Sequence, residues 1–306
     1  MSATAPSSMY PPPWLRRPKQ VIAKRFQIID RIDDGRNGFI YKAFDHDRQE
    51  FVAAKVAPID RRLTLIEEAD IYRRLFITND DKTAVWNGVD KNANDRACFP
   101  ELIWEGVDKF TYVLIWQLLS PNIDMLRSYC GGKLSLNTVK KIGYQMVDRL
   151  FTIHANDMVH ADICPTKFMF GSTGYNKGVL YLNDFGRCRK TGEIAETKRT
   201  LWCSIRRHST DHHEPRDDLE SMLYVLFYLL DGSLPWFGCT DNRAIARSKQ
   251  DYGPKRAAEI GLEEAWWFIQ NLNVTESRQL NYAPLTDAFL LNEDEPFDWD
   301  DQELFL

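Results

Sequence analysis

The sequence lacks the features that mark several classes of protein. Its six cysteines are scattered, with no C-x-x-C pair and no nearby His-x-x-x-His spacing, so neither a disulfide framework nor a zinc site is expected (Cys98, Cys130, Cys164, Cys188, Cys203 and Cys239). The net charge is −5, whereas general nucleic-acid binding leaves a basic footprint. The longest apolar run, residues 222–230, is far shorter than the ~18–20 residues that a membrane span requires.

Residues 1–20 have no apolar stretch after a basic start, so no signal peptide is expected either. Together these absences predict an intracellular protein with reduced thiols, in the cytoplasm, the nucleus or both, that binds neither nucleic acid nor membrane. The composition is ordinary for a globular protein, with 44% apolar and 27% charged residues among 306. That length suffices for one large domain or two lobes.

Up to residue 119 the pattern predicts mainly strands. Alternating apolar residues, many of them β-branched or aromatic, predict strands at 26–29, 39–44, 51–56, 102–104 and 111–118. Between them, residues 63–76 carry apolar side chains at helical spacing and predict one amphipathic helix. The polar stretch 79–97 predicts a long loop.

The remainder predicts mainly helices. A helix is expected over 135–155, with Ser135 or Asn137 as its N-cap, and an almost wholly apolar one over 218–231 that must be buried. Two short strands are expected at 168–170 and 179–182. Strands with one helix, followed by helices, predict an α+β fold of two lobes with a cleft as the preferred ligand site.

Several motifs then occur in an order that resembles a known family. They are VAAK at 52–55, EADIY at 68–72, DFG at 184–186, RDDLES at 216–221 and GSLPW at 232–236. From residue 26 to about 290, their order and spacing resemble the casein kinase I group of protein kinases, including its tau-tubulin kinase-like branch.

The resemblance implies the two-lobed eukaryotic protein-kinase fold. The β-rich N-lobe would comprise residues 21–119 and the mainly α-helical C-lobe residues 120–290. A disordered arm at 1–20, with three consecutive prolines, would precede them, and an acidic tail at 291–306 would follow.

The resemblance also implies binding of ATP with Mg²⁺. Lys55 would hold the α- and β-phosphates and pair with Glu68, although a lysine alone is more often a strand-edge residue. Asp184, the aspartate of DFG, would chelate the Mg²⁺ that bridges the phosphates.

The family's glycine-rich loop corresponds to residues 33–40. Gly35, Gly38 and Ile40 match it, and its glycines let backbone N–H groups approach phosphates. Asp33 replaces the first glycine, and with Asp34 it adds repulsion toward a polyanion, so weaker nucleotide affinity is expected. The alternative is a plain hairpin whose carboxylates point to solvent.

Two residues are expected to serve the structure. Trp116 aligns with the back of the nucleotide pocket and is expected to be a core indole. Asp218 matches the helix aspartate that anchors the catalytic loop backbone in kinases.

The catalytic loop, H-R-D-x-K-x-x-N in the family, is HADICPTK at 160–167 in this chain. Asp162 is retained and would accept the proton of the substrate hydroxyl. Ala161 replaces the arginine that reads a phosphorylated activation loop. Cys164 replaces the lysine that neutralises the γ-phosphate, and Lys167 replaces the asparagine that holds the second metal. Losing one such donor typically costs ~10²–10³ in rate.

Two interpretations of this loop stay open. In the first, the Lys167 ammonium replaces part of the lost charge, and the chain is a weakened Ser/Thr kinase that uses ATP with one metal ion. In the second, Lys167 blocks metal binding, and the chain is a pseudokinase that acts as a binding scaffold. Retention of Lys55, Glu68, Asp162 and Asp184 favours the first slightly. Cys164 is expected to be an inert packing residue rather than a reactive thiol.

The segment 187–199 is basic, and further cations follow it, so it favours acidic or phosphorylated protein substrates (Arg189, Lys190, Arg206 and Arg207). The alternative is a solvated loop with no partner. The acidic tail is expected to be solvated, or to fold back on this segment as an intramolecular inhibitor.

Overall fold

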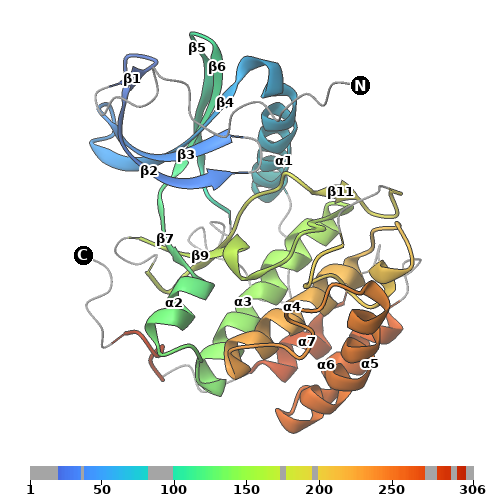
Figure 1. Ribbon diagram of the computed structural model, residues 1–306. Coiled ribbons are helices and arrows are strands. Elements are labelled where there is room, and N and C mark those ends of the chain that lie inside the picture. Colours follow the sequence, from blue (N-terminus) through green and yellow to red (C-terminus); the bar gives the residue numbers. More distant parts are fainter. Residues whose placement is uncertain are drawn as a thin grey trace. The chain divides into compact units, whose positions relative to one another are not determined.

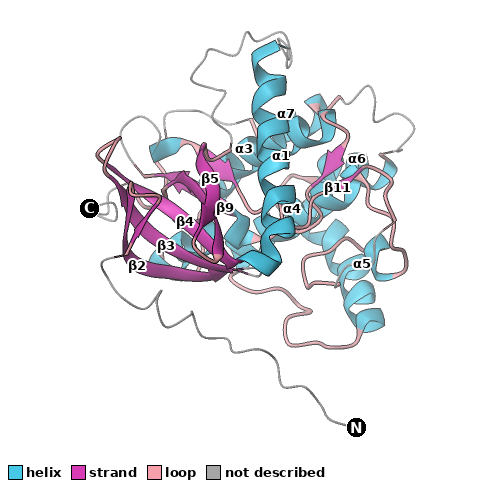
Figure 2. Ribbon diagram, turned by 90° about the horizontal axis from the view of Figure 1, so that it is seen from above, coloured by secondary structure: helices cyan, strands magenta, loops and turns pink. Residues whose placement is uncertain are grey.

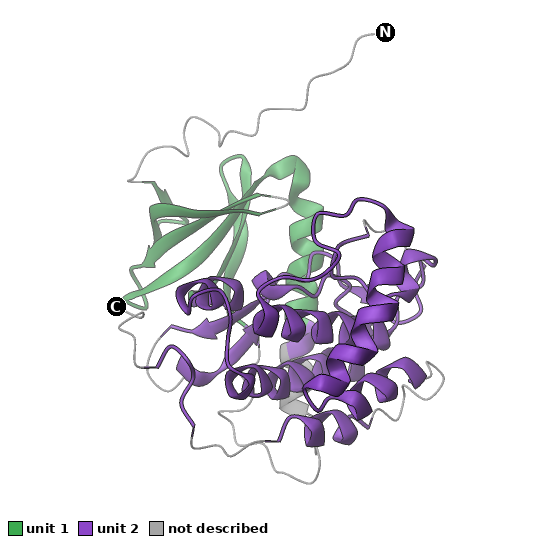
Figure 3. Ribbon diagram, turned by 60° about the horizontal axis from the view of Figure 1, so that its bottom comes forward, with its two compact units in different colours: residues 1–73, 100–119 green, residues 74–99, 120–306 purple. Residues whose placement is uncertain are grey.

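The structure is a computed structural model that describes residues 20–35, 38–81, 99–172, 177–194, 199–272, 281–290 and 295–300. The chain forms two compact units, residues 1–73 with 100–119 and residues 74–99 with 120–306 (Figure 3). Strands dominate the first and helices the second, so the fold is mixed α+β, as predicted. The arm predicted at 1–20 lies outside the described residues except for Gln20.

The first unit contains one antiparallel sheet of six strands in the order β1-β2-β3-β4-β6-β5 (Figure 2). The strands are β1 (Val21–Ile22), β2 (Phe26–Gly35), β3 (Gly38–Asp45), β4 (Glu50–Pro58), β5 (Leu102–Asp108) and β6 (Thr111–Gln117). Each strand predicted from the alternating pattern is present, whereas the two-residue β1 was not predicted.

Apolar side chains from five of these strands form the core of the first unit, and it includes Phe26, Ile28, Val52, Val113 and Ile115. After a short 3₁₀ turn, η2 (Ile59–Arg61), helix α1 (Arg62–Asp81) begins. Its residues Leu65, Ala69 and Tyr72 are buried, which confirms the predicted amphipathic helix. The helix is longer than predicted and includes residues 79–81 of the expected loop, and the rest of that loop, residues 82–97, lies outside the described residues.

The second unit is built from α2 (Ile123–Tyr129), α3 (Leu136–Ala155), α4 (Pro215–Asp231), α5 (Asn242–Glu259), α6 (Glu263–Asn271) and α7 (Ala283–Ala288) (Figure 1). Helix α3 packs against α4, whose residues are almost all buried, as its apolar sequence predicted. Ser135, not Asn137, is the N-cap of α3, because its hydroxyl accepts a 3.2 Å hydrogen bond from the N–H of Thr138.

Short strands hold the loop at 160–167 in place. Strand β8 (Met158–Val159) precedes this loop and pairs with β11 (Arg189–Lys190). The loop ends in a 3₁₀ turn, η4 (Pro165–Lys167), and leads into β9 (Phe168–Gly171). Strand β9 pairs with β10 (Leu180–Leu182) and lies between it and β7 (Leu119–Asn122). Because Asp184 follows β10 by two residues, pairing of β9 with β10 brings it close to the end of the loop.

The described part of the tail, residues 295–300, packs on the second unit. Trp299 is 1% exposed, its ring centroid is 5.2 Å from that of Phe170, and Phe297 stacks on it at 4.9 Å. The Asp298 carboxylate accepts hydrogen bonds from the N–H and hydroxyl of Ser135, both at 2.6 Å. The prediction that the tail is solvated is therefore wrong for residues 297–299. Their described contacts are with the start of α3 and with β9, and none of these joins them to the described part of the basic segment, residues 187–194 and 199.

Among the residues described, no helix combines the length and apolar character needed to cross a membrane.

Candidate functional site

The first unit holds a buried ion pair. The Lys55 ammonium on β4 lies 2.6 Å from Oε2 of Glu68 on α1, and the two residues are only 5% and 2% exposed. A charge buried at this depth is tolerated only with a partner, and removing one partner of such a pair typically costs about 3–5 kcal/mol. The structure thus brings together the two residues expected to form the phosphate-binding pair.

The glycine hairpin between β2 and β3 lies against β4 beside this pair. A Cβ atom on Gly38 would lie 2.5 Å from the carbonyl oxygen of Val56, so only glycine fits there without displacing the strand. A Cβ on Gly35 would lie 3.5 Å from Cε of Lys55, and Ile40 is the register partner of Lys55. Gly35 and Ile40 therefore lie beside Lys55, and Gly38 packs against Val56, the next residue of the same strand.

The carboxylates of this hairpin have local partners. Asp34 forms an ion pair with Arg31, and Asp33 accepts a 2.7 Å hydrogen bond from the N–H of Asp34. Arg31 thus offsets part of the negative charge expected to repel a nucleotide.

Trp116 lies in the core of the first unit. It is 8% exposed, and its ring centroid is 5.4 Å from that of Tyr72 on α1. Trp116 therefore packs in the core, as expected from the sequence.

In the second unit, two carboxylates and two cations form one chain of ion pairs, Arg187–Asp162–Lys167–Asp184. The Lys167 ammonium contacts the Asp184 carboxylate and lies 3.7 Å from Oδ2 of Asp162. Nη1 of Arg187 lies 3.0 Å from Oδ1 of Asp162. The two positive charges equal the two negative charges, and three of the four side chains are less than one-fifth exposed.

Lys167 carries its charge at neutral pH. Burial opposes the charged form, but the attraction and the hydrogen bond of Asp184 outweigh it, so the pKa of Lys167 is raised above its usual value. The Lys167 ammonium therefore contacts the carboxylate of Asp184, which the resemblance to protein kinases assigns to metal binding.

Asp218 on α4 holds the backbone of the loop. Its carboxylate accepts hydrogen bonds from the N–H groups of His160 (2.6 Å) and Ala161 (2.9 Å). His154 contacts the same carboxylate at 3.1 Å. Burial alone would raise the pKa of Asp218, but the hydrogen bond with His154 and the other contacts lower it overall. Asp218 thus makes the loop contacts that the resemblance predicted.

The backbone is strained at two positions of this site. Ala161 and Asp184 have φ angles of 61° and 63°, in the left-handed region that non-glycine residues rarely adopt. Such strain persists only where surrounding contacts hold it, and it clusters at functional sites. The hydrogen bonds of Asp218 supply that hold at Ala161.

Cys164 is half-buried, and its sulfur lies 3.3 Å from Oγ1 of Thr166. Burial raises the pKa of its thiol, so the thiolate form is rare at neutral pH. This supports the packing role over the reactive thiol.

The four residues expected to face the substrate have different environments. Lys190 is exposed and lies 3.8 Å from Asp157, and Arg189 lies 3.8 Å from Glu193. Arg206 is ion-paired with Glu214 at 3.1 Å and with Asp217 at 2.6 Å. Arg207 is 4% exposed and donates to the carbonyl of Thr210. The structure therefore does not bring all four together as one exposed basic surface, and their contact with substrate stays a prediction.

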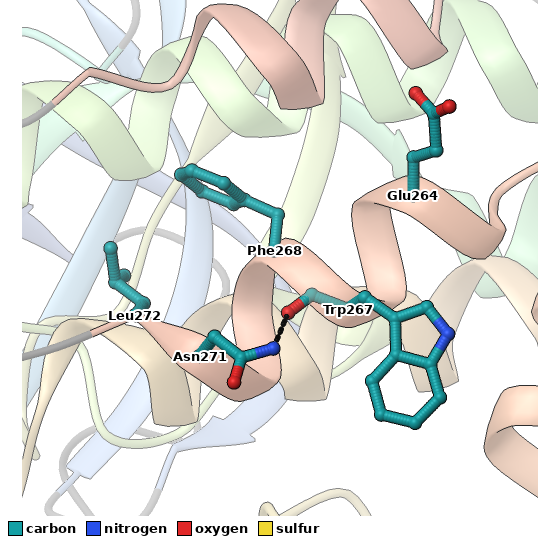
Figure 4. A pocket seen from close by; sticks show the side chains of 5 residues that line it. All are labelled: Glu264, Trp267, Phe268, Asn271 and Leu272. Carbon is teal, nitrogen blue, oxygen red and sulfur yellow. Dashed lines mark hydrogen bonds between the residues drawn. The ribbon is translucent and has the colours of Figure 1, made fainter.

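The described residues of the second unit line hollows at two places that bear on the site. A small pocket lies directly beside the strained loop, and its lining includes Ala161, Asp162, Arg199, Thr200 and Ser204. A larger, open depression lies along α6 (Figure 4), lined by Glu264, Trp267, Phe268, Asn271 and Leu272. The α6 depression shares no residue with the ion-pair chain, so the pocket at Asp162 is the better candidate for a hydroxyl-bearing substrate group.

Arg187 was not singled out from the sequence, where it was one of several cations in the segment 187–199. The signal was its position, because it immediately follows the DFG segment and so must stay near Asp184.

The carboxylate expected to hold a metal ion already contacts a cation. Mg²⁺ is usually held by one or two carboxylates together with substrate phosphates. Asp184 would contribute one such carboxylate, and it contacts the Lys167 ammonium. In the described part of the chain, no group of three or more His, Cys, Asp or Glu residues could hold a metal ion.

No protein-family model matches the chain.

Proposed function

We propose that this chain has the protein-kinase fold, resembles the casein kinase I group, and transfers the γ-phosphate of ATP to serine or threonine hydroxyls at a low rate. The observation that carries the proposal is the buried Lys55–Glu68 pair, with its 2.6 Å contact beside a glycine hairpin. A buried ammonium next to closely approaching backbone is an arrangement that suits the phosphates of a nucleotide.

The roles follow from the chemistry of each group. Lys55 binds the α- and β-phosphates, and Asp184 would hold one Mg²⁺. When bound, that ion would neutralise charge on the phosphate oxygens. Asp162 takes the proton of the substrate hydroxyl as its oxygen forms the bond to the γ-phosphorus. The bond from that phosphorus to the β–γ bridging oxygen breaks, and ADP leaves.

The substitutions in the loop reduce the rate but leave the base in place. Asp162 is held between Arg187 and Lys167, which orient its carboxylate. Acidic or phosphorylated proteins are the proposed substrates, because exposed Lys190 and the neighbouring Arg189 lie on the segment that follows Asp184.

A second candidate is a pseudokinase that binds a partner without catalysis. The contact between Lys167 and Asp184 favours it, because the ammonium must withdraw before a metal ion can use that carboxylate. In such a pseudokinase, the Lys167 ammonium would permanently take the place of the metal ion at Asp184.

A phosphotransfer assay with γ-³²P-labelled ATP and an acidic serine peptide distinguishes the two. We expect slow transfer by the wild type, none by Asp162→Asn, and an increase of ~10²-fold or more in Cys164→Lys/Lys167→Asn, which restores both family residues. The result would instead establish a pseudokinase if the wild type transferred no more phosphate than Asp162→Asn while Cys164→Lys/Lys167→Asn did transfer it.

A further inference from the structure

In the proposed mechanism, Arg187 only orients the carboxylate of Asp162. It lies three residues after Asp184, and its Nη1 is 3.0 Å from Oδ1 of Asp162. Lys167 is 3.7 Å from the other oxygen, Oδ2. The carboxylate that accepts the substrate proton therefore has a different cation at each oxygen.

The two cations have different surroundings. Lys167 contacts Asp184 directly, so its charge is directed to the carboxylate that would hold the metal. Arg187 contacts Asp162, beside which the substrate hydroxyl must meet the γ-phosphorus. Of the two, Arg187 is therefore better placed for the group in transfer.

A guanidinium suits this position chemically. It has five N–H donors in a planar fork, so it can hold a carboxylate and a phosphoryl oxygen at the same time. Its charge persists at any pH at which proteins fold. The side chain is 16% exposed, so its surroundings limit its freedom to swing away.

The chain also lacks a cation where the family has one. Position 164 is a cysteine, whose sulfur lies against Thr166 and whose raised pKa keeps it uncharged. Without Arg187, the one remaining ion-pair partner that the described residues give Asp162 is Lys167, which also contacts Asp184.

We propose that Arg187 contacts the γ-phosphoryl group of ATP and neutralises it during transfer, in place of the cation that position 164 no longer provides. This rests on the proposed function. The hydroxyl proton goes to Asp162, the new bond forms between hydroxyl oxygen and γ-phosphorus, and the electron pair of the broken bond leaves with ADP. Arg187 remains charged throughout and exchanges no proton.

The test compares the affinities of ATP and ADP by calorimetry, because only ATP has the γ-phosphate. We expect wild type to bind ATP about tenfold more tightly than ADP, as one charge-assisted contact of about 1.4 kcal/mol would give. Arg187→Gln should remove this difference by weakening ATP alone, and Arg187→Lys should keep part of it. Arg243→Ala, on the exposed first turn of α5, is the control for loss of a cation and should change nothing.

The outcomes separate the two proposals. Nucleotide binding with equal affinity for ATP and ADP, or a difference that survives in Arg187→Gln, overturns the role of Arg187 and leaves the proposed function standing. No binding of either nucleotide by wild type overturns both. Unfolding curves of each variant show whether the fold is intact. If Arg187→Gln does not fold, Arg187→Lys takes its place in the comparison. An Arg187→Lys protein that keeps the full tenfold difference between ATP and ADP would overturn the role of the guanidinium.

A second readout is rescue. If Arg187 replaces the missing lysine, the phosphotransfer lost in Arg187→Gln should return in Arg187→Gln/Cys164→Lys. If Arg187→Gln/Cys164→Lys were as inactive as Arg187→Gln, Arg187 would not be acting in place of the missing lysine.

Discussion

His208 shows how a single half-buried residue sets a response to pH. Its Nε2 lies 3.2 Å from the Lys249 ammonium and 3.5 Å from the sulfur of Cys203. Burial, together with the charges of Lys249 and Arg199, lowers the pKa of His208 to about 4, although the side chain of Asn242 opposes the shift. The neutral imidazole can accept a hydrogen bond from Lys249, whereas the protonated ring would repel it.

We therefore expect stability to fall as the pH is lowered from 6.5 to about 4. In this window the unfolded chain binds a proton at His208 and the folded chain does not, so protons favour unfolding. The ceiling is ~3 kcal/mol, and half-burial reduces it to ~1–2 kcal/mol.

Urea unfolding at pH 7 and pH 4.5 measures this effect. His208→Gln should lose less stability between the two pH values than wild type, whereas His212→Gln, at a more exposed histidine, should behave like wild type. If wild type and both variants lost the same stability between pH 7 and pH 4.5, carboxylates alone would cause the acid sensitivity.

At the scale of elements, strong periodicity made most of the fold predictable. Strands β2 to β6 and helices α1, α3 and α4 follow from apolar spacing, and Ser135 was one of the two caps expected for α3. Helix α5 was not predicted, because its sequence is polar and contains Pro254. It is stabilised by packing: a side chain at Gly253 would overlap the ring of Trp266 on α6. Propensity cannot anticipate a contact with a helix that comes later in the chain.

The packed tail leads to a prediction about stability. Trp299 is almost fully buried against Phe170, so Trp299→Ala should lower the free energy of unfolding by ~2–4 kcal/mol. Asp298→Ala should cost ~1–2 kcal/mol, because it removes the hydrogen bonds to Ser135 at the start of α3. Glu295→Ala, at an exposed position of the same segment, is the control.

Chemical denaturation measures these changes, and peptide binding tests the inhibitory alternative. An intact fold with stronger binding of acidic peptide after Trp299→Ala would restore the idea of an inhibitory tail. Loss of stability without such a gain supports the packing role.

At the scale of the whole molecule, the site could be predicted only in part. Lys55, Glu68, Asp162, Asp184 and Lys167 follow from motifs, since each motif places a residue type at a fixed step along the chain. The partner of each side chain does not follow, because pairing depends on side-chain direction in three dimensions. For this reason Arg187 was missed, and buried Arg207 was expected at the surface.

The charge balance of the ion-pair chain predicts how the molecule responds to metal. The proposed function needs one Mg²⁺ at Asp184, and Lys167 competes with the ion for that carboxylate. We therefore expect ATP to raise the melting temperature by a few degrees when Mg²⁺ is present, and by less in EDTA. In Lys167→Asn, which removes the competing ammonium, stabilisation by ATP should depend on Mg²⁺ more steeply.

Differential scanning fluorimetry of both chains, with ADP for comparison, measures this. A wild type that needs Mg²⁺ as strongly as Lys167→Asn would show that the ammonium yields readily to the ion.

The alternating order Arg187–Asp162–Lys167–Asp184 also restricts the routes by which this sequence can diverge. Removing either cation alone leaves an excess of negative charge among half-buried groups, and removing either aspartate leaves an excess of positive charge. Stepwise change is therefore easiest in compensating pairs. A gain of lysine at position 164 would relax the requirement for arginine at 187, so the two positions should covary among descendants of this chain.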